Sequence, residues 1–307
     1  MYIETLKLWE GRSDVELTTF VTMPDAFFQT LEKRPAVIVC PGGAYQNCPR
    51  HGNEGDPVAM AFAMEGYQSF VLEYSVQERA PEGKTLFPAQ LVDLARAMVV
   101  LREHAQEWSV DVDKISIIGF SAGAHLCGMM ATSWHEPWLA ERVDVSPEDL
   151  KPLTAMLIYG LLDYTVQEAF NKAHKNPMLP VDINSTVFGC PEPDEAMCRA
   201  NSPAQKITEN TVPIFMAAAV DDGMVNTIQS VYMAEKLHKA GIPYELHMFE
   251  YGDHGFSLGR NLIEPFRQDK IHACAQWLPL AKTFLMHHIA PETTVYEQNP
   301  FAAFENE

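Results

Sequence analysis

The sequence predicts an α/β fold with a doubly wound, mainly parallel sheet, and three observations support this class. Short apolar runs typical of strands buried on both faces alternate with segments of helical periodicity almost throughout the chain. At 307 residues, 47% of them hydrophobic, the chain can bury a large core. No internal repeat breaks the alternation, so we expect the strands to share one sheet covered by helices.

Apolar runs, periodicity and turn residues assign the elements in chain order. Residues 3–21 are typical of an N-terminal β-hairpin that turns at 10–13. The expected core strands are 36–40, 68–73, 115–118, 155–159, 213–220 and 244–249. The expected helices are 57–65, 88 to about 108, a helix that follows Gly123, 225–240 and most of 263–289.

Composition argues against several classes of function. Nucleic acids and anionic membranes are disfavoured by a net charge of −19, because phosphate binding needs clustered Lys and Arg. No stretch of 18 uncharged apolar residues is present, and the first residues lack a basic leader and an apolar run. We therefore expect a cytoplasmic protein without a membrane partner, whose six scattered cysteines are free thiols. Homo-oligomers remain possible.

The most informative segment is Gly119-Phe120-Ser121-Ala122-Gly123, which lies between an apolar strand and a helix of small residues. This is G-x-S-x-G in the strand–turn–helix context of a nucleophile elbow, where a serine hydroxyl is exposed at the tip of a sharp turn. The glycines leave room for the strand and the helix to approach. Because the pattern alone arises by chance in roughly one chain of this length in ten, the hypothesis depends on partners elsewhere.

A catalytic serine needs a base, and the base needs an orienting carboxylate; in this fold class the chain order is Ser, acid, His. Of the eleven histidines, His254 lies in a glycine-flanked loop just after a predicted strand, where a base can reach the elbow. Asp221 and Asp222 both follow the strand 213–220. We favour Asp222, because one carboxylate of the pair can face the histidine while the other binds the turn. Spacing alone leaves the choice open, and Asp163 is a weaker candidate.

The developing oxyanion also needs backbone N–H donors. One is the N–H of Ala122, the residue after the serine. The loop after the first core strand, Pro41 to Tyr45, contains Gly42 and Gly43 and is the natural second source, because glycines let the backbone approach a substrate closely.

Taken together, these segments resemble the α/β-hydrolase superfamily, and within it the small carboxylesterases related to acetylxylan esterases and hormone-sensitive-lipase-like acetyl esterases. The matching segments lie within about residues 36–285 and are 41–45, 87–90 with Asp93, 119–125, 221–225 and 252–256. The implied triad is Ser121, Asp222 and His254, and the implied oxyanion amides are those of Gly43, Ala44 and Ala122. The family's D-x-x-V spacing selects Asp222, with Val225 as the valine. The resemblance implies that no metal or organic cofactor is needed.

The sequence departs from the family pattern at three positions. The common oxyanion motif is H-G-G-G-[WY], but here Pro41 replaces the histidine and Ala44 the third glycine. Asn226 lies where the family often has proline. Since the proline form is familiar among sugar-ester esterases, we expect the oxyanion role to be kept, with a slightly narrower pocket beside the alanine.

We expect residues 1–289 to form one α/β-hydrolase domain and 290–307 an acidic tail, docked or disordered. Residues 164–211 carry five prolines between two strands, and long connections in compact domains are usually functional. We interpret this segment as a small cap insertion over the active-site edge.

The expected function is hydrolysis of short-chain esters, chiefly acetyl esters, by a serine carboxylesterase acting on small molecules or on xylo- or manno-oligosaccharides. Tyr45 and Tyr164, with Phe170 and Phe188, could stack on a sugar ring or could equally be core. The alternatives are a serine peptidase, a general small-ester hydrolase and a non-catalytic binding protein. The absence of a large propeller domain that would gate peptides counts against a peptidase. The insertion is proline-rich and charged, whereas a lipase needs a broad apolar lid. A lost triad member would indicate a non-catalytic protein, and none is missing.

Overall fold

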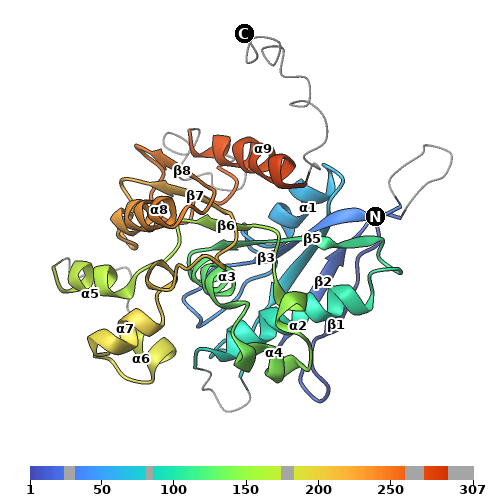
Figure 1. Ribbon diagram of the computed structural model, residues 1–307, viewed down its shortest axis with the longest axis horizontal. Helices are drawn as coiled ribbons and strands as arrows, with labels where there is room; N and C mark the ends of the chain where they lie inside the picture. Colours follow the sequence, from blue (N-terminus) through green and yellow to red (C-terminus); the bar gives the residue numbers. More distant parts are fainter. Residues whose placement is uncertain (24–31, 81–85, 174–182, 260–272, 290–307) are drawn as a thin grey trace, which may run out of the picture.

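The computed structural model describes residues 1–23, 32–80, 86–173, 183–259 and 273–289 (Figure 1). In this part of the chain eight strands form one sheet in the order β1-β2-β4-β3-β5-β6-β7-β8. The strands are β1 (Thr5–Lys7), β2 (Glu16–Phe20), β3 (Arg34–Cys40), β4 (Gln68–Glu73), β5 (Val110–Phe120), β6 (Ala155–Ile158), β7 (Ile214–Ala219) and β8 (Tyr244–Phe249). The pairs β1–β2 and β2–β4 are antiparallel, and every other pair is parallel. The predicted fold class and N-terminal hairpin are confirmed.

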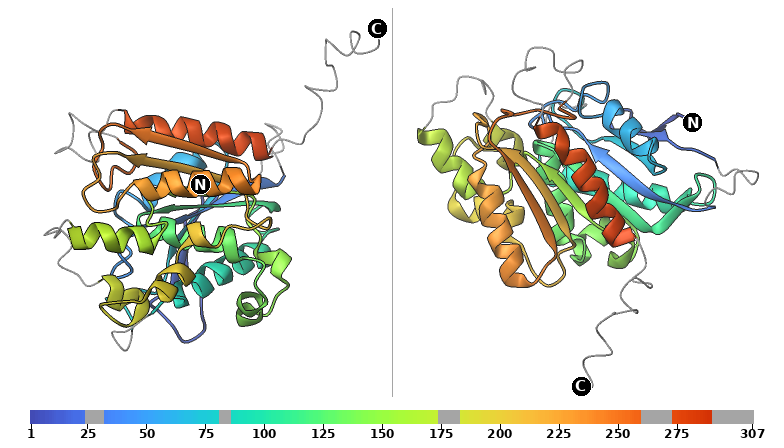
Figure 2. Two further views of the ribbon diagram at one scale, coloured as in Figure 1. Left: turned by 60° about the vertical axis from the view of Figure 1, so that its left-hand side comes forward. Right: turned by 90° about the horizontal axis from the view of Figure 1, so that it is seen from above.

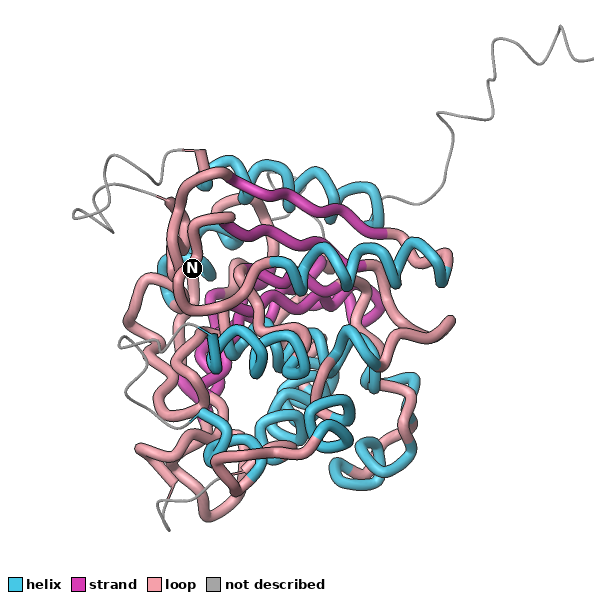
Figure 3. Tube along the Cα trace, turned by 90° about the vertical axis from the view of Figure 1, so that its left-hand side faces the viewer, coloured by secondary structure: helices cyan, strands magenta, loops and turns pink. Residues whose placement is uncertain are grey.

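Helices cover both faces of the sheet (Figures 2 and 3). One face packs against α1 (Asp56–Ala63) and α9 (Trp277–Ile289). The other packs against α2 (Ala89–Glu103), α3 (Ala122–Ser133) and α8 (Ile228–Ala240), and α4 (Pro137–Val143) packs on α2 at this side. Strand β3 shows why the central strands are continuously apolar. Ile38 and Cys40 point toward α2 and α3, whereas Val37 and Val39 point toward α1 and α9, and all four are fully buried.

Several helices differ in length from the prediction. Helix α1 spans 56–63 rather than 57–65. Helix α2 ends at Glu103 rather than near Trp108. The chain turns there, so that the Trp108 ring packs 5.3 Å from that of Phe70 and the Trp108 carbonyl accepts a hydrogen bond from Gln68. Helix α8 begins at Ile228 rather than at residue 225, because the preceding residues wrap around an aspartate side chain. The short helix α4 and the 3₁₀ turn η1 (Pro147–Leu150) were not predicted.

The described part of the predicted insertion contains α5 (Tyr164–Ala173), α6 (Ile183–Phe188), α7 (Glu195–Ala200) and a 3₁₀ turn, η2 (Pro203–Gln205). These helices gather at one end of the molecule, on the left in Figure 1. Residues 174–182 of the insertion, the start of the expected helix 263–289 and the expected tail 290–307 lie outside the described residues. The described end of that helix is η4 (Cys274–Gln276) followed by α9. Within the residues described, no helix has the length and apolar character needed to span a bilayer.

Candidate active site

The sharp turn between β5 and α3 presents Ser121. Its φ is 52° and its ψ −115°, a conformation that L-residues rarely adopt, and its N–H donates to the carbonyl of Ile158 at 3.0 Å. A Cβ on Gly119 would lie 2.0 Å from the carbonyl oxygen of Gly123, and a Cβ on Gly123 would lie 2.0 Å from that of Cys40. The flanking residues must therefore be glycines if the strand and the helix are to approach this closely.

Three side chains from the carboxyl ends of different strands meet at this turn. The Ser121 Oγ lies 2.8 Å from His254 Nε2, and His254 Nδ1 lies 2.8 Å from Asp222 Oδ2. The Asp222 side chain is fully buried and that of His254 is 11% exposed. Since an ionised carboxylate only accepts hydrogen bonds, Nδ1 carries the proton and the Nε2 lone pair faces the serine hydroxyl.

The two adjacent aspartates point in different directions and have different partners. Besides His254, Asp222 accepts the backbone N–H groups of 224–225 on its other oxygen, at 2.8 and 2.9 Å. Asp221 instead accepts the N–H groups of 252–253 at 2.8 and 2.7 Å and so fastens the loop that carries the histidine. Asp222 thus faces the histidine and also binds its own turn, whereas we expected the other aspartate to bind that turn. The role of Asp222 as the catalytic acid stays a prediction.

Opposing effects act on the imidazole of His254. Burial disfavours the charged ring, but the negative charges of Asp222, Glu54 and Asp253 outweigh it, so the pKa of His254 is raised above its ordinary value. The site is therefore built to tolerate an imidazolium. That is the state a base enters after taking a proton.

Backbone N–H groups border the same pocket. Gly43, Ala44 and Ala122 all line it, and within the described chain their N–H groups pair with no protein acceptor. Gly43 has a φ of 124°, and a Cβ there would lie 2.2 Å from the carbonyl oxygen of Asn47, so this turn requires glycine. Ala44 follows with a φ of 54°. The arrangement provides donors for a negatively charged oxygen next to the serine.

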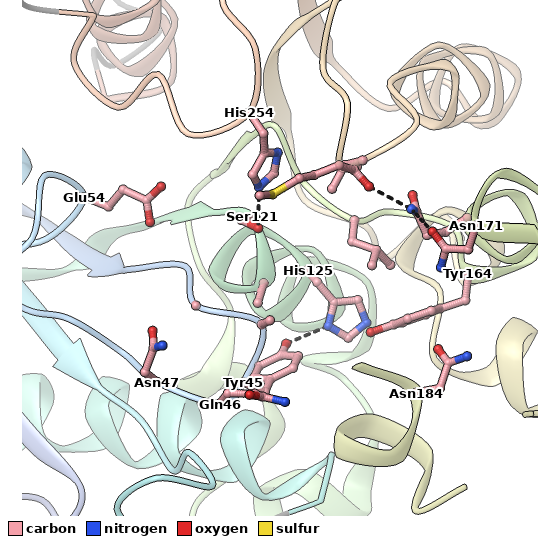
Figure 4. A pocket seen from close by; sticks show the side chains of 17 residues that line it. Tyr45, Gln46, Asn47, Glu54, Ser121, His125, Tyr164, Asn171, Asn184 and His254 are labelled. Atoms are coloured by element: carbon pink, nitrogen blue, oxygen red, sulfur yellow. Dashed lines mark hydrogen bonds between the residues drawn. The ribbon is translucent and has the colours of Figure 1, made fainter. Parts of the chain in front are cut away.

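The cavity in front of Ser121 has a volume of about 300 Å³ (Figure 4). Its apolar lining includes Leu161, Met224 and Val225. Side-chain amides form much of the remaining wall, namely those of Gln46, Asn47, Gln167, Asn171 and Asn184. The last three belong to the predicted insertion, which thus reaches the site. Sequence reasoning missed these amides and Glu54, since no motif marks them.

Tyr45 and Tyr164 line the pocket, but they are only 1% and 2% exposed. Their rings pack edge-on against His125, with centroids 5.7 and 5.3 Å away, and Phe188 packs against Tyr164. These tyrosines therefore form part of the pocket wall with their rings buried, whereas Phe170 and Phe188 are half-buried. The stacking of an aromatic ring on a sugar stays a prediction. Asp163, the weaker candidate for the acid, binds elsewhere. It accepts hydrogen bonds from the backbone N–H and the hydroxyl of Thr165 at the start of α5.

The BD-FAE family model matches residues 27–237, more than half of the chain. The chain belongs to the BD-FAE family. Among curated proteins it is 29% identical over 229 residues to endo-1,4-beta-xylanase B of Butyrivibrio fibrisolvens, covering 75% of this chain and 33% of that protein. It is 27% identical to esterase LipQ of Mycobacterium tuberculosis (68% and 47% covered) and 23% identical to an acetylxylan esterase of Xylanibacter ruminicola (73% and 41%). The chain thus spans about a third to a half of the length of these relatives.

Solved structures match this BD-FAE chain over almost its whole length. The α/β-hydrolase enzyme MGS-M1, from a Medee basin deep-sea metagenome library, is 28% identical with a TM-score of 0.70, covering 94% of this chain and 98% of the other. The carboxylesterase Cest-2923 of Lactobacillus plantarum WCFS1 gives a TM-score of 0.78 at 22% identity, with 95% and 100% covered. The predicted α/β-hydrolase fold and the predicted likeness to esterases are confirmed.

Proposed function

We propose that this protein is a serine carboxylesterase that hydrolyses short-chain esters. The observation that carries the proposal is the hydrogen-bonded series from Ser121 through His254 to Asp222 at the mouth of a pocket bordered by unpaired backbone N–H groups. The esterase relatives support the same class of reaction. Nucleophile, base, orienting acid and oxyanion donors are the four elements that acyl transfer requires.

In the first half of the reaction, the Ser121 oxygen attacks the ester carbonyl while His254 Nε2 takes the hydroxyl proton. The carbonyl oxygen becomes an oxyanion, which the N–H groups of Ala44 and Ala122 stabilise, with Gly43 as a further donor. The imidazolium returns its proton to the departing alcohol as the ester C–O bond breaks, which leaves an acyl-serine. Asp222 holds Nδ1–H throughout and stabilises the imidazolium.

In the second half, water attacks the acyl-serine as His254 takes a proton from it. The collapsing intermediate releases the carboxylic acid, and the imidazolium returns the proton to the Ser121 oxygen. No atom is oxidised or reduced in this cycle, and water is the only co-reactant.

The finer proposal is that the substrates are acetyl esters of oligosaccharides such as xylo- or manno-oligosaccharides. Asn171 and Asn184 of the insertion line the cavity, where the Asn171 N–H₂ group can donate to sugar hydroxyls and the Asn184 amide oxygen can accept from them. Gln167 instead donates to the Asn171 side-chain oxygen and so holds that amide in place. Apolar residues border the other part, which suits a short acyl group. The acetylxylan esterase among the relatives supports this choice. A general small-ester hydrolase remains the alternative.

The test is to compare p-nitrophenyl acetate, alkyl acetates and acetylated xylo- and manno-oligosaccharides as substrates for the wild-type protein and Ser121→Ala. We expect Ser121→Ala to lose activity on the order of 10⁴-fold or more, with an unchanged circular dichroism spectrum. Near-wild-type turnover by this variant would refute the serine mechanism. Equal kcat/KM values on sugar and alkyl acetates would retain the esterase and remove the carbohydrate preference.

A further inference from the structure

Glu54 is a carboxylate that lines the pocket, and it lies outside the hydrogen-bonded series from Ser121 through His254 to Asp222. It lines the same cavity as Ser121 and His254, and Figure 4 shows its carboxylate directed toward them from the side opposite Asn171. A Cβ on Gly42 would lie 2.8 Å from Glu54 Oε2 and 3.0 Å from Ser121 Cβ. Only a few ångströms therefore separate this carboxylate from the nucleophile.

Each oxygen of Glu54 accepts a hydrogen bond from a different part of the site. Oε2 accepts the backbone N–H of Gly42 at 2.7 Å, immediately before the oxyanion loop 43–45. Oε1 accepts the phenolic O–H of Tyr159 at 2.7 Å. Both partners are donors, which is the pairing that an ionised carboxylate makes.

Tyr159 carries the connection onward to the histidine. Its hydroxyl oxygen accepts the backbone N–H of Ser257, three residues after His254, at 3.1 Å. Its ring packs edge-on against the imidazole of His254, with centroids 5.1 Å apart. The tyrosine is 1% exposed, so these contacts are shielded from water.

We propose that Glu54 is a positioning residue that holds the oxyanion loop and the histidine loop in register through Gly42 and Tyr159, and whose negative charge stabilises the imidazolium of His254. This inference rests on the proposed esterase function. Without Glu54, the N–H of Gly42 and the O–H of Tyr159 lose the acceptor that they share. A shift of either loop misaligns donors and base together.

The charged groups that face His254 come from several elements. Asp222 follows β7, Asp253 is the neighbour of His254 in the loop, and Glu54 precedes α1. The ring of Tyr159, which follows β6, also packs against the imidazole but is not one of these charged groups. Asp222 acts most strongly, and Glu54 adds to it by helping to raise the pKa of His254. Removal of the Glu54 charge should therefore lower the pKa of His254 while Asp222, the hydrogen-bond partner of the ring, stays in place.

The test compares Glu54→Gln, Tyr159→Phe and the control Glu65→Gln on p-nitrophenyl acetate. Glu65 is exposed and pairs with Lys282, so its variant makes the same chemical change away from the pocket. The measurements are kcat, KM, the pH profile of kcat/KM and the midpoint of thermal unfolding.

For Glu54→Gln we expect kcat to fall on the order of 10- to 100-fold with little change in KM. The acid limb of kcat/KM, which reports protonation of the base, should move to lower pH. Tyr159→Phe keeps the charge, so its kcat should fall while its acid limb stays near that of the wild type. Glu65→Gln should match the wild type in both respects.

Wild-type kcat and an unmoved acid limb in Glu54→Gln would overturn the inference and leave the esterase assignment intact. An inactive wild-type protein would instead refute the proposed function on which the inference rests. If Glu54→Gln lowers the unfolding midpoint too far to be assayed, Tyr159→Phe tests the same connection from its other end. Wild-type kcat in that variant would then overturn the proposal.

Discussion

The phenolic oxygen of Tyr45 lies 2.6 Å from His125 Nδ1, so one buried hydrogen bond joins the oxyanion loop to the helix that follows Ser121. His125 Nε2 lies 2.7 Å from the carbonyl oxygen of Asn201, next to α7. Because that carbonyl can only accept, Nε2 carries the proton, and Nδ1 accepts from the tyrosine. The neutral histidine thus connects three separate segments around the pocket.

Tyr45→Phe should destabilise the protein by about 1–3 kcal/mol, because it leaves the buried Nδ1 of His125 without a donor. The ring and its packing remain, so the fold should persist. Thermal or urea unfolding measures the loss. Tyr232→Phe is the control, because Tyr232 is 44% exposed on α8. Equal stability of Tyr45→Phe and the wild type would show that the hydroxyl contributes nothing.

His125 should also make stability depend on pH. Burial lowers its pKa from 6.5 to about 4. Below pH 6.5 the unfolded chain therefore binds a proton that the folded chain does not bind until the pH approaches 4. Stability should fall by about 3 kcal/mol across this range, beyond the effect of other groups. His125→Gln keeps a donor and an acceptor but does not titrate, so its unfolding free energy should depend less steeply on pH. Parallel curves for the two proteins would contradict this assignment.

Asp222→Asn should reduce kcat on the order of 10³- to 10⁴-fold, because an amide can donate to Nδ1 and stabilise the wrong histidine tautomer. Asp221→Asn should cost far less, since the amide oxygen can still accept the two N–H groups that Asp221 binds. Steady-state kinetics on p-nitrophenyl acetate distinguish the two variants. If Asp221→Asn proves the more damaging change, the roles of the two aspartates are exchanged.

Acyl chain length should be limited by the cavity of about 300 Å³. Each methylene that fits gains about 0.8 kcal/mol from burial, and the first that does not fit loses that gain to steric exclusion. Activity on p-nitrophenyl esters should therefore peak between acetyl and butyryl and fall sharply by octanoyl. A preference for long-chain triglycerides would show that the acyl group binds elsewhere.

The central strands could be predicted because burial on both faces leaves continuous apolar runs in the sequence. The elbow and the His254 loop could be recognised because sharp turns require glycines at fixed spacing. Helix ends were less predictable: α8 starts late because the Asp222 side chain takes the N–H groups of 224–225, a tertiary effect without local pattern.

The remaining parts of the site depend on contacts between distant segments. Glu54 and Tyr159 are 105 residues apart and belong to no motif, so only the folded chain reveals that they meet. The sequence likewise does not indicate whether an aromatic ring is exposed or buried. Tyr45 and Tyr164 lie where substrate contacts were expected, yet their rings are covered by His125, Phe87 and Phe188.

The position of β8 at the edge of the sheet affects the order in which the parts of the site are synthesised and assembled. Ser121 leaves the ribosome more than 130 residues before His254, because the histidine loop follows β8, which is the last of the described strands and lies at the edge of their sheet. Such long-range pairing forms late and slowly in folding. A growing chain therefore carries the elbow serine without His254 until β8 and the loop after it have been made, so the proposed pair of nucleophile and base cannot form earlier.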